Sequence, residues 1–300
     1  MKAAAVKAEG SVREKLAIVT EDKRVIDMTT AARQSGSDYH VPETMIQAAA
    51  EGEVFWEEAE KLTKWVLANN REDCIQTFDD VTLSAPIPAP LKNIMCAGKN
   101  YRDHALEMGS EADVPEDPII FTKAPTTVIG PGEEIHSHPG ITEEVDYEGE
   151  IAVIIGKEGS GISAEQADDH IFGYTLVNDV TARDLQKRHK QFFLGKSLDT
   201  FCPMGPYIVR PEEIKGKDIT LETYVNGERR QQAAVSQMIF SVSSLIEIIS
   251  RAITLQPGDV IATGTPAGVG KGFNPPRLLH PGDEVVVTAE GLGRLTNRVQ

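Results

Sequence analysis

Short apolar runs separated by turn residues are the dominant pattern along the second two-thirds of this chain. Val, Ile and Leu concentrate in the runs, and turn segments such as Gln256-Pro-Gly-Asp259 and His280-Pro-Gly-Asp283 lie between them. This combination is typical of β-strands joined by tight turns. The pattern predicts strands over residues 93–97, 119–121, 127–128, 150–155, 173–177, 207–209, 219–225, 260–262 and 284–289.

Helical periodicity is confined to a few segments. Between residues 42 and 69 the apolar positions fall near helical spacing, and Gly52 predicts a break there. Another helix is expected over residues 163–171, because Ser163-Ala-Glu-Gln166 has the form of a capping box. Shorter helices are expected over 185–189 and 245–249. Strands outnumber helices, so the sequence predicts a β-rich α+β fold.

The first part of the chain predicts a small leading domain. Residues 16–19 and 24–26 are expected to form short strands around a turn at 21–23. The segment Ala85-Pro-Ile-Pro-Ala-Pro90 cannot continue a helix or a central strand, because proline lacks a backbone N–H. We therefore expect an N-terminal domain over residues 1–85 and a larger domain over residues 86–300.

The overall charge narrows the range of partners. The 300 residues carry a formal net charge of −16, which disfavours nucleic acid and anionic membranes as partners. An anionic substrate would therefore need locally concentrated Lys or Arg. No apolar run reaches the roughly 18 residues of a membrane span, the N-terminus is too polar for a signal peptide, and the 3 cysteines are widely spaced. These features predict a cytoplasmic protein.

Two stretches place carboxylates beside apolar strands. In VDYEGEIAVIIG, Asp146, Glu148 and Glu150 alternate along the chain and could share one face of a strand. An exposed acidic edge strand is the alternative, but the apolar run 151–155 favours burial. In GYTLVNDVTARD, Asp179 follows an apolar strand and could instead be a turn residue or an N-cap. Together, Glu148, Glu150 and Asp179 offer only oxygen ligands, which suits Mg²⁺ or Mn²⁺.

These two stretches resemble the metal-ligand blocks of the fumarylacetoacetate hydrolase superfamily. The resemblance continues, in the family's order, through 195–206, 225–227 and 257–266, and it covers roughly residues 88–300. It implies a catalytic domain built as a mixed β-sandwich roll, a homodimer, and Glu148, Glu150 and Asp179 as the metal ligands. Asp146 does not match a ligand position of the short-chain members, so it is expected to be a neighbour of the metal.

The resemblance also implies roles for residues outside the acidic blocks. Gly98-Lys-Asn-Tyr-Arg-Asp-His-Ala-Leu-Glu-Met108 matches the family's lid helix, in which His104 and Glu107 would form an acid–base pair. Their i, i+3 spacing places both side chains on one helix face, where a carboxylate can orient an imidazole as a general base. The remaining predicted site residues are Lys196 as a catalytic group, and Arg102, Lys123 and Thr265 as substrate contacts.

Two other motifs predict no site. The stretch from Thr263 to Gly272 resembles a phosphate-binding loop, but its glycine and lysine spacing does not fit GxxxxGK[ST]. His136 and His138 could chelate a metal, yet Pro139-Gly140 follows them directly and favours a turn.

The expected activity is metal-dependent cleavage of a C–C bond in a small 2-oxoacid. Overall similarity favours decarboxylation of oxaloacetate to pyruvate, in which the metal stabilises the enolate left when CO₂ departs. A hydrolase acting on an acylpyruvate or fumarylpyruvate is the alternative, with the His104–Glu107 pair activating water. An isomerase of a 2-oxo diacid and a non-catalytic regulatory protein on the same fold are further alternatives.

Overall fold

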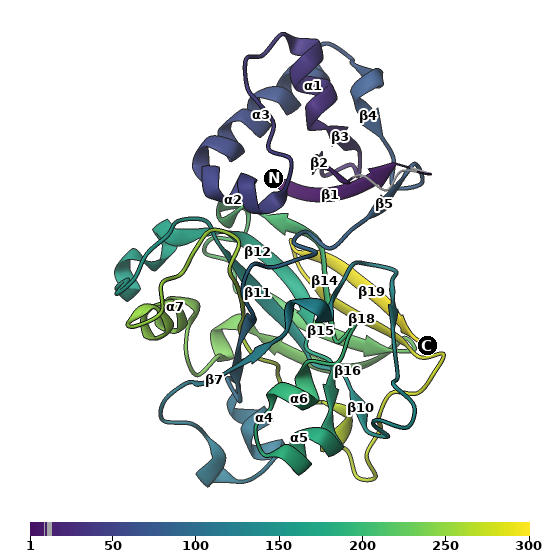
Figure 1. Cartoon of the computed structure of the whole chain (residues 1–300), viewed down its shortest axis with the longest axis vertical. Coiled ribbons are helices and arrows are strands. Elements are labelled where there is room, and N and C mark those ends of the chain that lie inside the picture. The colour runs from purple at the N-terminus through teal and green to yellow at the C-terminus, as the bar shows by residue number, and fades with distance from the viewer. Residues whose placement is uncertain (9, 11–13) are drawn as a thin grey trace.

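A large mixed sheet runs through the whole molecule (Figure 1). The computed structural model describes residues 1–8, 10 and 14–300. The sheet has 12 strands, and its main path has the order β4-β3-β2-β1-β14-β12-β11-β17-β6-β7. Its strands are β1 (Lys2–Ala8), β2 (Glu14–Val19), β3 (Val25–Asp27), β4 (Ile75–Gln76), β5 (Val81–Leu83), β6 (Ile94–Gly98), β7 (Ile119–Lys123), β8 (Val128–Ile129), β11 (Gly149–Ile155), β12 (Ile171–Asn178), β14 (Cys202–Val209) and β17 (Val260–Ala262).

A second sheet of 5 strands packs against the first, in the order β16-β15-β18-β19-β9. Its strands are β9 (Glu134–Ile135), β15 (Thr220–Val225), β16 (Glu228–Ala234), β18 (Glu284–Ala289) and β19 (Gly293–Val299), and a separate pair is formed by β10 (Val145–Asp146) and β13 (Thr181–Ala182). One buried cluster joins Ile151 and Leu176 of the large sheet to Leu221 and Val287 of the small one. The sheets are therefore held together as a sandwich by burial of apolar side chains.

Gly149 lies where β11 of the large sheet packs against the small sheet. A Cβ atom at this position would overlap Thr223 Oγ1 and press against the side chain of Val287. Because successive residues of a strand point to opposite faces, Glu148 and Glu150 point away from this contact. The glycine thus lets the sheets pack while its two neighbours face the other side.

Most helices lie at the two ends of the molecule, and α7 lies on one side between them (Figure 1). α1 to α3 lie at the end that contains β1 to β5, and α4 to α6 lie at the other end. No helix in the described part of the chain is both long and apolar enough to cross a membrane. The helices are α1 (Met28–Ser35), α2 (Met45–Glu51), α3 (Glu53–Ala68), α4 (Arg102–Glu107), α5 (Arg183–His189), α6 (Phe193–Lys196) and α7 (Val242–Ser250).

Each strand predicted from the apolar runs is present, with ends shifted by a few residues. The predicted break at Gly52 separates α2 from α3. Among the strands that the prediction missed are β1 and β16, whose sequences KAAAVKA and ERRQQAA are rich in alanine or polar residues. Both strands form because they pair with neighbours, β1 between β2 and β14, and β16 with β15. Tertiary pairing overrides weak local propensity there.

The predicted capped helix over 163–171 is wrong. Residues Ala164–His170 form a 3₁₀ helix, and the side chain of Ser163 makes no capping bond to the backbone. Its Oγ lies 3.4 Å from Gln166 Oε1, while the Gln166 N–H donates to the Ser163 carbonyl. The S-x-x-Q spacing is met, but the tighter i, i+3 winding replaces the α-helical turn that a capping box needs.

The domain boundary after residue 85 stays a prediction, and several contacts join the two sides of it. β1 pairs with β14, so strands from both sides belong to one sheet. Trp56 of α3 stacks on Phe172 of β12, with 4.9 Å between ring centroids, and its Nε1–H donates to the Phe172 carbonyl at 3.1 Å. The N-terminal helices are therefore anchored on the sheet through an aromatic contact and a buried hydrogen bond.

Trp56→Ala is expected to lower the free energy of unfolding by about 3–5 kcal/mol, because it removes a large buried ring and leaves a cavity. Urea denaturation followed by circular dichroism measures this loss. Trp65→Ala is the matched control: Trp65 lies on the same helix but is only partly buried, so its loss should cost clearly less. Equal losses for the two variants would contradict the anchoring role of Trp56.

Candidate metal and acid–base site

The predicted acidic residues meet where β11 begins and β12 ends. The two strands are antiparallel, with Gly149 opposite Asn178. The Asp179 N–H donates to the Glu148 carbonyl at 2.8 Å, which places the two side chains at the same strand ends. One carboxylate oxygen each of Glu148, Glu150 and Asp179 lies within 4.8 Å of the others, and all three residues are buried. Of the described residues, no other group of three His, Cys, Asp or Glu side chains comes together in this way.

Two buried lysines compensate this negative charge. Lys123, at the end of β7, places Nζ 2.6 Å from Asp179 Oδ1. Lys196, at the end of α6, places Nζ 2.6 Å from Asp179 Oδ2 and 2.7 Å from Glu148 Oε2. Lys123 is fully buried and Lys196 is 2% exposed, so neither is an ordinary solvated lysine. The site therefore contains locally concentrated positive charge, which an anionic substrate would need in a chain with a net charge of −16.

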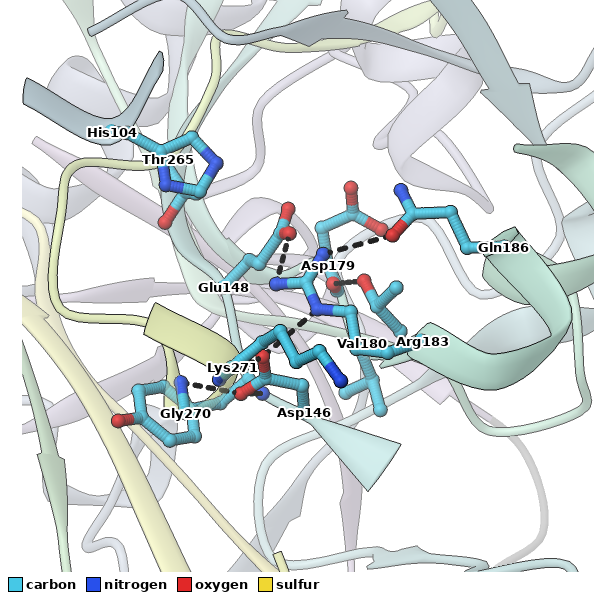
Figure 2. A network of polar contacts seen from close by, with 12 residues as sticks. His104, Asp146, Glu148, Asp179, Val180, Arg183, Gln186, Thr265, Gly270 and Lys271 are labelled. Atoms are coloured by element: carbon cyan, nitrogen blue, oxygen red, sulfur yellow. Dashed lines mark hydrogen bonds and ion pairs between the residues drawn. The ribbon is translucent and has the colours of Figure 1, made fainter. Parts of the chain in front are cut away.

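Arg183 and Asp146 extend the network beneath the triad (Figure 2). The guanidinium of Arg183 lies between two carboxylates, with Nε 2.9 Å from Asp146 Oδ2 and Nη2 2.7 Å from Glu148 Oε1. Asp146 is fully buried and also accepts from the backbone N–H groups of Gly270, at 2.7 Å, and Lys271, at 3.0 Å. Asp146 is thus occupied as an acceptor by Arg183 and by the loop that contains Gly270 and Lys271.

Their surroundings shift the pKa values of Glu148 and Glu150 in opposite directions. Burial opposes ionisation of Glu148, but Lys196, Arg183 and His104 outweigh it and lower its pKa to about 2. Burial, together with the charges of Asp179 and Glu148, raises the pKa of Glu150 well above its ordinary value. The hydrogen bond that Glu150 accepts from the Gly264 N–H, at 2.7 Å, only partly offsets this effect. Negative charge at Glu150 is therefore under-compensated by the protein.

This donor set fits a divalent cation. A cation beside Glu150 would supply the missing positive charge. Carboxylate oxygens without His or Cys are the ligands that Mg²⁺ and Mn²⁺ accept, with the remaining positions left to water or substrate. Glu148, Glu150 and Asp179 are the residues that would hold the ion.

The lid helix brings the predicted acid–base pair to the site. His104 Nδ1 lies 3.4 Å from Glu107 Oε2, and His104 is 5% exposed. His104 is close enough to Glu148 to contribute to the lowered pKa of that carboxyl group. Glu107 in turn accepts from the Gly268 N–H at 2.9 and 3.0 Å. The lid is therefore closed onto the loop that follows β17.

Thr265 belongs to a polar group that faces the start of β11. Its Oγ1 donates to the Gly149 carbonyl at 2.9 Å and accepts from Gln231 Nε2 at 2.7 Å. Gln231 Oε1 accepts from the Gly149 N–H at 3.0 Å, so the backbone N–H and carbonyl of Gly149 both have partners.

Arg102, also predicted to contact the substrate, does not join these residues: its side chain is 54% exposed and forms an ion pair with Glu111 on the outer side of the lid.

Arg183 and Gln231 were not predicted. Arg183 stands near the end of the quoted block GYTLVNDVTARD, and a basic residue a few positions after an apolar strand of a strongly acidic chain was a usable signal. Gln231 gave none, because β16 has no run of large apolar residues. Of the two histidines dismissed as a metal site, His138 begins a turn: its carbonyl accepts from the Ile141 N–H at 3.0 Å, and its Nε2 lies 2.9 Å from the Asp199 carbonyl.

Two hollows lie outside the triad. A hollow of about 220 Å³ adjoins the lid, and its walls include Tyr101, Arg102 and Pro266. A larger hollow of about 710 Å³ lies between the N-terminal helices and the sheet, lined among others by Trp56 and Ile151. Ile151 and Glu150 point to opposite faces of β11, so this larger hollow is separate from the acidic site.

Comparisons with known proteins agree with the expected family. The sequence profile described as "Fumarylacetoacetate (FAA) hydrolase C-terminal" matches residues 93–300. A Bacillus subtilis (strain 168) protein named oxaloacetate tautomerase YisK is 51% identical over 285 residues, which cover 94% of this chain and 95% of that protein. The predicted resemblance is therefore confirmed.

Solved structures agree with the predicted β-rich α+β fold. The fumarylacetoacetate hydrolase (EaFAH) from psychrophilic Exiguobacterium antarcticum is 38% identical, with a TM-score of 0.82 and coverage of 100% of this chain and 99% of that one. A 2-hydroxyhepta-2,4-diene-1,7-dioate isomerase from Mycobacterium marinum is 33% identical, with a TM-score of 0.72 and coverage of 100% and 98%. The fold prediction is confirmed.

Asp146→Ala is expected to lower the free energy of unfolding by about 3–5 kcal/mol, because it breaks a buried ion pair and leaves donors without an acceptor. Chemical denaturation measures the loss. Lys271→Ala is the control: it keeps the backbone N–H that Asp146 accepts from and removes only a half-exposed ion pair with Glu144, which should cost less than about 1 kcal/mol. A loss below 1 kcal/mol for Asp146→Ala would contradict its anchoring role.

Proposed function

Because the chain belongs to the fumarylacetoacetate hydrolase family, we propose that it catalyses the keto–enol tautomerisation of oxaloacetate or a closely similar 2-oxo diacid. The observation that carries this proposal is the closure of a His–Glu pair over a buried, all-oxygen metal-type site. The 51% identity to a protein named oxaloacetate tautomerase supports the choice of substrate. Tautomerisation needs one proton moved between C3 and the C2 oxygen, and an acid–base pair suits that step.

The acidic site would bind the 2-oxoacid end of the substrate. A divalent cation held by Glu148, Glu150 and Asp179 would supply a Lewis acid that polarises the C2 oxygen. Lys123 and Lys196 keep the carboxylates of Glu148 and Asp179 paired, so that the site does not repel an anionic substrate. This local positive charge is needed in a chain whose net charge is −16.

The lid supplies the proton transfer. A carboxylate beside Nδ1 favours the imidazole tautomer with a proton on Nδ1, which leaves Nε2 of His104 able to take or give a proton at C3. Glu107 therefore orients the ring. Arg102, the predicted contact for the distal carboxylate of the substrate, would have to leave its ion pair with Glu111 on the outer side of the lid to serve this role.

Decarboxylation of oxaloacetate, the reaction favoured by the sequence, is the second candidate. As in tautomerisation, negative charge develops on the C2 oxygen. The C3–C4 bond breaks, its electron pair moves toward that oxygen, and CO₂ leaves. C3 then takes a proton. The buried cations beside the triad favour it, because they stabilise negative charge that develops on the C2 oxygen. Hydrolysis of an acylpyruvate would instead require water activated by the His104–Glu107 pair.

A single set of assays distinguishes these reactions. Enol oxaloacetate is diluted into buffer with Mn²⁺ and protein, and the ultraviolet absorbance of the enol is followed, while pyruvate is measured with lactate dehydrogenase and acetylpyruvate is tested in parallel. We expect loss of the enol faster than pyruvate appears. Pyruvate formed at the same rate as the enol disappears would favour decarboxylation, and activity on acetylpyruvate alone would favour the hydrolase. No conversion of either substrate would overturn the proposed mechanism.

His104→Gln and Glu107→Gln are expected to lower kcat for tautomerisation by roughly 10²–10⁴-fold, the range for loss of general acid–base catalysis. Steady-state kinetics measures this effect. Asp103→Asn is the control, since Asp103 is an exposed neighbour on the same helix. A kcat within twofold of the wild type for His104→Gln would show that the imidazole does not transfer the proton.

Glu150→Gln is expected to weaken Mn²⁺ binding by at least about 100-fold, because a ligand is lost outright rather than a supporting residue. Isothermal titration calorimetry measures the affinity without substrate. Glu165→Gln, which removes an exposed carboxylate from the 3₁₀ helix after β11, should leave it unchanged. Equal affinity in wild type and Glu150→Gln would exclude Glu150 as a ligand.

A further inference from the structure

The glycine-rich loop over residues 264–272 binds carboxylates of the protein itself. Its backbone N–H groups donate to side chains from three separate segments. Gly264 donates to Glu150 at 2.7 Å, Gly268 to Glu107 at 2.9 Å, and Gly270 to Asp146 at 2.7 Å. One loop therefore contacts a metal-site carboxylate, the lid, and the acid that holds Arg183.

The loop can do this because its backbone is fixed in a glycine-specific shape. Gly264 and Gly268 have φ angles of +103° and +104°, which side chains rarely permit. Gly268 also lies so close to Arg230 that a Cβ atom would overlap the Arg230 carbonyl. The Tyr147 hydroxyl donates to the Gly268 carbonyl at 2.8 Å and ties the loop to the segment just before β11. The N–H groups are thus held in place before any ligand binds.

Different contacts hold the two ends of the lid helix α4, the base before Arg102 and the tip at Glu107. At the base, the fully buried Asn100 donates from Nδ2 to the carbonyls of Phe240 and Thr263, and its Oδ1 accepts from the Phe240 N–H. At the tip, the carboxylate of Glu107 accepts from Gly268. The base is anchored whatever the position of the tip, so the Glu107–Gly268 bond decides where the acid–base pair lies.

We propose that the loop over residues 264–272 is a positioning element that fastens the lid's acid–base pair relative to the metal site, through the bond from Gly268 to Glu107. The proposal rests on the function proposed above for its catalytic consequence, but not for its structural one. Gly268 acts through Glu107, and Glu107 acts through His104. Asp146 supports the arrangement from below, because Gly270 and Lys271 of the loop donate to the carboxylate that also pairs with Arg183.

Gly272→Ala tests the proposal without disturbing the loop's special backbone. Gly272 has no positive φ, so alanine is tolerated there, and the atoms nearest to the added Cβ belong to the Glu107 side chain, which it would overlap. A flexible carboxylate can move away, which breaks its bond to Gly268. Gly159→Ala is the matched control: the atoms nearest to its Cβ likewise belong to side chains, those of His170 and Ile162, and not to the lid.

The first readout is hydrogen exchange in the lid, measured by mass spectrometry on the full chain. The amides of Ala105 and Met108 are bonded within the helix and report on its order. We expect Gly272→Ala to speed their exchange at least tenfold and Gly159→Ala to leave it unchanged. The second readout is a fall in kcat of roughly 10-fold or more with little change in KM, as expected when a proton-transfer group is misplaced.

A double-mutant cycle identifies Glu107 as the residue through which Gly272→Ala acts. In the Glu107→Ala background, Gly272→Ala should have no further effect on exchange, because the overlapping carboxylate is gone. Additive effects in the cycle, or wild-type exchange in Gly272→Ala, would overturn the proposal. If the wild type fails to convert oxaloacetate while Gly272→Ala still loosens the lid, the proposed function is wrong and the positioning role of the loop stands.

Discussion

Three carboxylates buried side by side are the constraint on which the rest of this molecule depends. Glu148, Glu150 and Asp179 would repel one another strongly in a dry interior if no positive charge were near them. The cations that compensate them come from separate elements, since Lys123 ends β7, Lys196 ends α6 and Arg183 begins α5. Helices that look peripheral in Figure 1 therefore complete the charge balance of the sheet. The charge left over at Glu150 is what makes the site suited to a divalent cation.

The sandwich architecture places these charges at one end of two strands. Gly149 allows the small sheet to pack against one face of β11, while its neighbours Glu148 and Glu150 face the other way. The antiparallel pairing of β11 with β12 then brings Asp179 alongside. The alternation of side chains along β11 therefore places apolar packing on one of its faces and the carboxylates on the other. A one-residue shift in register would exchange them and destroy both.

The backbone N–H groups of the glycine-rich loop over residues 264–272 bind carboxylates in the way that a phosphate-binding loop binds a ligand. A phosphate-binding loop presents backbone N–H groups to the oxygens of a ligand. The loop over residues 264–272 presents such groups to Glu107, Glu150 and Asp146 of its own chain. The glycine and lysine spacing of this loop does not fit GxxxxGK[ST], and its N–H donors bond to carboxylates of the protein. In this way the backbone of the loop connects the lid to the metal site.

The sequence by itself determined the features that depend on local pattern. The apolar runs predicted the core strands, and the spacing of Glu148 and Glu150 before such a run predicted a buried acidic site. Matching motifs also identified Lys123, Lys196, His104 and Glu107, which the structure brings to one end of the sheet. The weak patterns of β1 and β16 carried no such signal, because those strands form only through their partners.

Tertiary structure alone decided which charges meet. No spacing along the chain indicates that Arg183 lies between Asp146 and Glu148, or that Gln231 satisfies both Gly149 and Thr265. It also decided that Arg102 points outward to Glu111 while Glu107, on the same short helix, turns inward to Gly268. Burial and ion pairing depend on distances between segments far apart in sequence, and only the packed chain sets those distances.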